Sequence, residues 1–137
     1  MSQEIERHDI ESLLDEFRKL DAEMKIIISD WQGSYVDGVW TPNLHDNPEK
    51  DFSILERLFQ LYDSLSTLFD KKKDVLNEHS ELKTMVCTYM NKLKMSVEKI
   101  RNGEFNFIDD PNIESFHTVW MSLHQSLESY AKDIENG

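Results

Sequence analysis

Three long stretches of this sequence place apolar residues at alternating spacings of three and four. Such spacing puts the apolar side chains on one stripe of an α-helix, as in the seam of a coiled coil. The first stripe is Ile10, Leu13, Phe17, Leu20, Met24, Ile27 and Trp31, and the last is Ile113, Phe116, Trp120, Leu123, Leu127, Tyr130 and Ile134. The pattern predicts an all-α, coiled-coil-like protein with helices over about 9–32 and 111–135.

The middle stretch, about 50–102, allows two interpretations. It contains no Gly or Pro, and its heptad phase is the same on both sides of a polar segment, which favours one continuous central helix flanked by the two shorter antiparallel helices. Ordinary globular helices are much shorter than this, which favours a break near 74–80 and an up-down four-helix bundle. We expect the continuous helix and keep the bundle as the alternative.

The 137 residues fit a single helical domain with two connectors, 33–51 and 103–112. Asp37-Gly38 lies between two apolar pairs in the first connector, a pattern that is typical of a very short β-hairpin. Both connectors also carry aromatic residues where solvated turns are expected. If the middle helix breaks, both connectors lie at the same end of the bundle, and if it is continuous they lie at opposite ends of a rod.

A second apolar stripe in the middle stretch suggests how the protein functions. Leu61, Leu68, Val75 and Leu82 lie one heptad apart, beside the main seam. A helical hairpin would leave this stripe partly exposed, and soluble monomers rarely tolerate large apolar patches. The main hypothesis is therefore a non-catalytic subunit or adaptor that assembles a complex with itself or a protein partner. Its candidate contact residues are this stripe together with Trp40 and Phe107 in the connectors.

Charge supports a second hypothesis. The net charge is −12, which disfavours direct binding to nucleic acid or anionic lipid. One flank of the first helix carries an acidic ladder, Asp9, Glu16, Glu23 and Asp30, whereas residues 52–101 have a net charge of +2. The ladder either complements the basic middle stretch within the fold or faces solvent. In the second case the protein would be an acidic inhibitor of a basic nucleic-acid-binding protein or toxin.

Catalysis is the weakest of the three hypotheses. The sequence has no phosphate-binding glycine loop and no nucleophile elbow, so we predict no catalytic, cofactor or metal residues. The alternative is a helical metal enzyme around Glu114, His117 and His124, although a di-iron bundle needs two Glu-x-x-His pairs and this sequence has one. The single cysteine, Cys87, is expected to be buried. A polar N-terminus and the absence of a long apolar run lead us to expect a cytoplasmic or nuclear protein without a membrane span.

Overall fold

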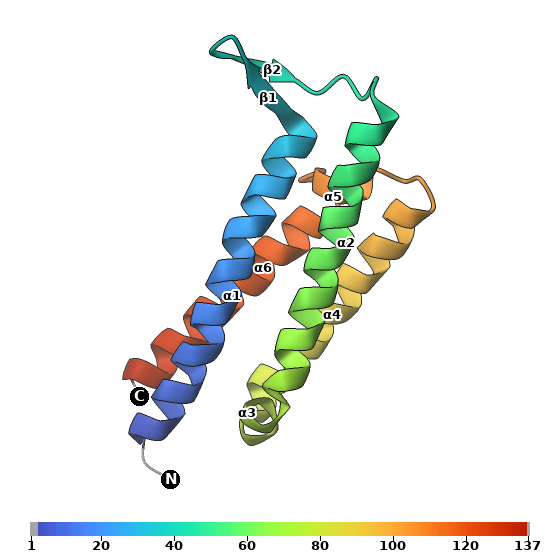
Figure 1. The fold of residues 1–137 in the computed structure, drawn as a ribbon. Helices are drawn as coiled ribbons and strands as arrows, with labels where there is room; N and C mark the ends of the chain where they lie inside the picture. The colour runs from blue at the N-terminus through green and yellow to red at the C-terminus, as the bar shows by residue number, and fades with distance from the viewer. Residues whose placement is uncertain (1–2, 137) are drawn as a thin grey trace.

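A computed structural model describes residues 3–136 of the chain, with side chains from residue 7 onward. The chain is all-α apart from one two-stranded hairpin, as the heptad patterns predict (Figure 1). The elements in chain order are α1 (Gln3–Gln32), β1 (Gly33–Val36), β2 (Val39–Pro42), α2 (Pro48–Lys71), α3 (Lys73–Glu78), α4 (Ser80–Arg101), α5 (Asn106–Asp109) and α6 (Phe116–Asn136).

The four long helices run alternately up and down as a bundle, with α1 packed between α2 and α6 and with α4 against α6 (Figure 1). The hairpin and α5 lie at one end, which we call the apex, and α3 lies at the other. The rings of Phe17 and Phe116 both stack against the fully buried Trp120, with centroid distances of 5.2 and 5.7 Å. The heptad residues of α1 and α6 thus form one continuous core.

The prediction of one continuous helix over about 50–102 is wrong. The helix is interrupted at Lys72 and again at His79, where φ is −127° and ψ is 81°, which matches the alternative break near 74–80. The polar residues at this turn have partners on the neighbouring helices. Lys72 Nζ donates to Ser12 Oγ at 3.2 Å, and His79 Nδ1 lies 2.8 Å from the Tyr130 hydroxyl. Folding back is favoured because it buries the wide apolar face that a rod of about 75 Å would expose.

The expected exposure of the second stripe is therefore also wrong. Leu61, Leu68 and Leu82 are only 2%, 7% and 1% exposed. Val75, on the short α3, is half-buried against the same core. Because α4 returns alongside α2, the stripe faces the interior of the same chain and does not require a second one.

Cys87 also departs from its prediction. Its side chain is exposed on α4. In the described part of the chain, no helix is long and apolar enough to cross a membrane.

Candidate protein interface at the apex

The hairpin at the apex follows directly from the end of α1. Asp37 and Gly38 both have positive φ, 51° and 80°, which is the backbone conformation of a type I′ turn. The turn pairs Val36 with Val39 and Tyr35 with Trp40 in an antiparallel register, and the short hairpin expected at Asp37-Gly38 is confirmed. The rings of Tyr35 and Trp40 meet edge to face, with centroids 5.3 Å apart.

Gly33 allows the hairpin to fold close to the end of α1. A Cβ atom at this position would collide with the carbonyl oxygen of Thr41 and would lie 2.9 Å from the Trp40 ring. Only glycine fits here without moving the second strand, so the sequence Gln32-Gly33 determines where the helix ends and how the hairpin is placed.

The rest of the first connector is held by polar contacts. Asn43 donates from its side chain to the Trp31 carbonyl oxygen and to Asp51 Oδ1, both at 3.0 Å. The His45 ring lies 4.4 Å from that of Trp31, and its Nδ1 is 2.9 Å from Asp51 Oδ2. Asn47 then caps α2 by accepting from the amide of Lys50. These contacts tie the connector to the ends of α1 and α2.

The second connector reaches the apex from α4. Gly103, with φ of 90°, ends that helix, and the Phe105 ring lies 5.7 Å from Trp31. Gln32 donates from Nε2 to Asp109 Oδ2 at 2.9 Å, which joins α1 to α5. The two connectors therefore share one end of the bundle, as expected for a broken middle helix.

Apolar side chains gather on this end. Nine large apolar side chains are exposed in the part of the chain whose side chains are described, and seven of them belong to the apex. We call these seven the apical surface: Tyr35, Val36, Val39, Trp40, Leu44, Phe52 and Phe105. The other two, Ile26 and Met95, lie on the sides of α1 and α4. Such a concentration is typical of an interaction surface and unusual for a solvated loop region.

The apical surface continues into a groove between the start of α2 and the end of α4. The groove encloses about 380 Å³ and is lined mainly by Phe52, Leu55, Phe59, Ile100 and Phe105. The guanidinium of Arg101 lies over the Phe59 ring, 4.5 Å from its centroid. Apolar surface is thus available on the hairpin and on the adjacent groove.

Trp40 and Phe107, the two connector residues chosen from the sequence as contact candidates, differ in how exposed they are. Trp40 is 42% exposed and belongs to the apical surface. Phe107 is half-buried against the core, with Lys99 Nζ 5.9 Å from its ring centroid, so it supports α5 and offers little surface. Val36, Val39, Leu44 and Phe52 were not among the candidates chosen from the sequence, although the Asp37-Gly38 turn signal located the hairpin that carries two of them.

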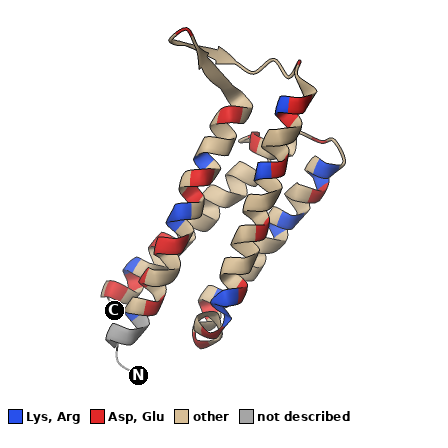
Figure 2. Ribbon diagram, viewed as in Figure 1, with Lys and Arg blue, Asp and Glu red and all other residues tan. Residues whose placement is uncertain are grey.

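The acidic ladder of α1 is in part used inside the fold. Glu16 pairs with Lys71 at 3.2 Å and with Lys72 at 3.3 Å, and Asp30 pairs with Arg57 at 2.8 Å. The hydrogen bond from Lys71, reinforced by that from Lys72, lowers the pKa of Glu16. Asp9 is half-buried and Glu23 is exposed. Figure 2 shows α1 and α2 side by side, with basic residues toward both ends of α2, so α2 already neutralises part of the ladder.

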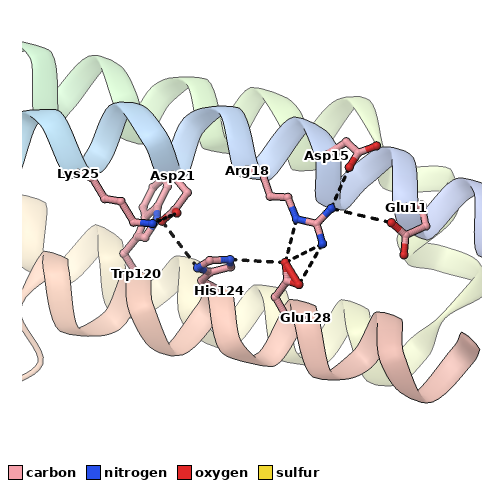
Figure 3. Close-up of polar contacts among 8 residues, drawn as sticks. All are labelled: Glu11, Asp15, Arg18, Asp21, Lys25, Trp120, His124 and Glu128. Carbon is pink, nitrogen blue, oxygen red and sulfur yellow. Dashed lines mark hydrogen bonds and ion pairs between the residues drawn. The ribbon is translucent and has the colours of Figure 1, made fainter. Parts of the chain in front are cut away.

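A buried polar cluster joins α1 to α6 and was not found from the sequence (Figure 3). Asp21 is 4% exposed and accepts a 3.0 Å hydrogen bond from Trp120 Nε1. Lys25 Nζ lies 3.1 Å from Asp21 Oδ2, and His124 Nδ1 lies 3.8 Å from Asp21 Oδ1. The available signal was Trp120 itself, because a tryptophan at the centre of a seam needs an acceptor for its indole N–H.

The cluster continues toward the C-terminal end of α6. Arg18 donates from Nε and Nη2 to both carboxylate oxygens of Glu128, at 2.9 and 3.0 Å, and Nη1 donates to Asp15 at 2.9 Å (Figure 3). The hydrogen bond from Arg18 lowers the pKa of Glu128, against a smaller opposite effect of burial. His124 Nε2 lies 3.6 Å from the same carboxylate. This arrangement orients α6 on α1.

The histidines of α6 do not assemble a metal site with Glu114. Glu114 is exposed and pairs with Lys92 at 3.1 Å, whereas His124 faces Asp21 and Glu128. Across the residues that the structure describes, no three His, Cys, Asp or Glu side chains are grouped so as to hold a metal ion.

We compared the chain with models of known protein families, with curated proteins and with solved structures, and none of the three comparisons gave a match.

Proposed function

We propose that this protein is a non-catalytic interaction module that binds a protein partner through the apical surface. One observation carries the proposal: seven of the nine exposed large apolar side chains of the described region lie at the same end of the bundle. The helical stripe that first suggested an interface packs in the core, so we propose that the partner contacts the connectors instead of the helix faces.

The composition of the apical surface also supports binding. Aromatic residues dominate the energetics of protein interfaces, and this surface contains Tyr35, Trp40, Phe52 and Phe105. Covering one such side chain fully contributes roughly 1.5–3 kcal/mol, so several anchors together can offset the entropic cost of association. The contacts of Asn43 and His45 hold the connector in place before binding, which reduces the ordering cost further.

The test compares two matched double variants. Tyr35→Ser with Trp40→Ser removes two apical anchors, and Ile26→Ser with Met95→Ser removes two equally exposed apolar residues elsewhere. Far-UV circular dichroism checks that both variants keep the helical fold. The tagged protein is crosslinked in extracts of its source cells, and each captured protein is purified and its affinity is measured by calorimetry.

We expect a purified partner that binds the wild type and the Ile26/Met95 variant equally but binds the Tyr35/Trp40 variant at least tenfold more weakly. Equal affinity for all three forms would overturn the proposal, because the apical anchors would then contribute nothing. Equal weakening by both double variants would also contradict it, since the effect would not be specific to the apex.

A further inference from the structure

The hairpin projects beyond the ends of the helices and leaves two strand edges uncovered (Figure 1). β1 and β2 pair only with each other in the described part of the chain. An uncovered strand edge offers backbone N–H and C=O groups to any extended chain that approaches, and proteins usually protect such edges with lysines, prolines, short strands or covering loops. This hairpin is short and has no lysine or arginine in either strand, and Pro42 is the last residue of β2.

The register identifies the backbone groups at these edges. In a hairpin with a two-residue turn, the pair next to the turn exchanges backbone hydrogen bonds and the following pair does not. Here Val36 and Val39 flank the turn and Tyr35 faces Trp40 in the next pair. The N–H and C=O groups of Tyr35 and Trp40 therefore point outward, one set on each edge. Among the described residues, no backbone hydrogen bond connects either residue to an element outside the hairpin.

We propose that one of these edges binds an extended segment of the partner as an added β-strand, an inference that rests on the proposed function. Side chains alternate along the hairpin, so Tyr35 and Trp40 lie on one face and Val36 and Val39 on the other. All four side chains are exposed, Tyr35 by 73%. An added strand therefore meets apolar neighbours on both faces, and its own side chains at alternate positions determine specificity.

Charge selects the chemistry of the added strand. Residues 30–57 carry six acidic and two basic side chains, and residues 99–115 carry four acidic and two basic ones, so this end has a net charge of −6. Of the acidic side chains, Asp30 is already paired with Arg57. A second copy of this chain would bring two such acidic ends together, whereas a segment carrying Lys or Arg is attracted. The occupant is thus an extended segment of another protein that combines apolar residues with Lys or Arg.

A displayed library of random twelve-residue peptides is the first probe. It is selected on the wild-type protein after depletion on the Tyr35→Ser/Trp40→Ser variant. We expect enriched peptides in which apolar residues alternate and basic residues outnumber acidic ones. Enrichment of acidic peptides, of peptides with a helical period, or of none would overturn the inference.

Backbone substitution of one enriched peptide supplies the matched control. N-methylation of alternate residues blocks one edge of a strand and leaves the other intact. We expect N-methylation of one set of alternate residues to lower the affinity of the peptide for the protein at least tenfold. N-methylation of the other set should change this affinity less than twofold. Hydrogen exchange of the outward amide of Tyr35 or Trp40 should slow at least tenfold on binding, while Val36 and Val39 change little. Affinity should fall at least threefold between 50 and 500 mM NaCl.

Two outcomes separate this inference from the proposed function. In the first, peptide binding requires Tyr35 and Trp40 and yet keeps its affinity after N-methylation of either set of alternate residues. In that case the strand-addition mechanism fails and the apical interface remains. If the partner binds the Tyr35→Ser/Trp40→Ser variant as well as the wild type, the proposed function itself fails. A mass of twice 16.2 kDa in light scattering that this variant abolishes would also overturn the inference, because the occupant would then be a second copy.

Discussion

Replacement of Asp21 by Ala tests how much the buried cluster between α1 and α6 contributes to stability. The carboxylate accepts from Trp120 Nε1 at 3.0 Å, and the Trp120 side chain is fully buried. The variant leaves the indole N–H without an acceptor, which costs about 1–3 kcal/mol. Asp21→Asn keeps an oxygen acceptor for the indole but replaces the other carboxylate oxygen by an NH2 group, which removes the ion pair with Lys25, so its cost should be about 1 kcal/mol.

Chemical unfolding measured by circular dichroism gives these differences directly. For a chain of this length, 1 kcal/mol corresponds to a melting shift of roughly 3–4 °C, so Asp21→Ala should melt about 3–12 °C below the wild type. The slope of the unfolding free energy against denaturant concentration should stay unchanged, because both proteins expose the same surface on unfolding.

A double-mutant cycle with Trp120→Phe isolates the hydrogen bond from the other effects of each change. We expect Asp21→Ala and Trp120→Phe to be coupled by about 1–2 kcal/mol, because the second change removes the donor that the first leaves unsatisfied. A coupling near zero, or a loss below about 0.5 kcal/mol for Asp21→Ala alone, would refute the argument that this bond orients α6 on α1.

Four further results follow from the structure. Glu128→Gln should lower the free energy of unfolding by about 0.5–1 kcal/mol at pH 7. Since Arg18 lowers the pKa of Glu128 in the folded state, this difference should be constant above the unfolded pKa of about 4.3 and vanish as the pH falls through the folded pKa, which urea unfolding from pH 7 to 3 can follow. Leu68→Glu should destabilise the fold by about 3–5 kcal/mol and Val75→Glu by clearly less, because Leu68 is buried and Val75 half-buried; equal losses in thermal melts would contradict this. Gly33→Ala should displace the hairpin and weaken partner binding while the melting temperature of the bundle changes by less than about 3 °C; calorimetry and thermal melts check both. Small-angle scattering should give a particle no longer than about 65 Å, because α1, with 30 residues, spans about 45 Å and the hairpin adds about 13 Å; a rod near 75 Å would restore the continuous helix.

The sequence predicted both outer helices because each carries a single apolar seam, but α1 begins at Gln3 and not near 9, and α6 begins at Phe116 and not near 111. Along α1 and α6 a single seam alternates strictly in threes and fours, and Phe17 and Trp120 on these seams meet in the core. The hairpin was predictable for a similar local reason, since Asp37-Gly38 favours a type I′ turn regardless of the rest of the fold.

The middle stretch was mispredicted because its heptad spacing is the same whether the helix continues or the chain turns back. The heptad phase continues across the segment near Lys72 and His79, and no Gly or Pro marks a break there. What decides the break is long-range: the wide apolar face of α2 has to be buried, and α1 and α4 of the same chain bury it together. The contacts between α1 and α6, such as those of Trp120 with Asp21 and of Arg18 with Glu128, form only after the chain has folded back.

The same error explains why the candidate interface moved. A wide apolar face signals a missing partner only if the chain cannot supply one itself, and here α1 and α4 supply it. Once Leu61, Leu68 and Leu82 are accounted for by the core, seven of the nine large apolar residues that remain exposed in the described region lie where the chain reverses. At these reversals the backbone is outside the helices, so its N–H and C=O groups are accessible together with the apolar side chains. A partner that binds the apex can therefore use main-chain hydrogen bonds as well as apolar contacts, which the buried helical stripe could never have offered.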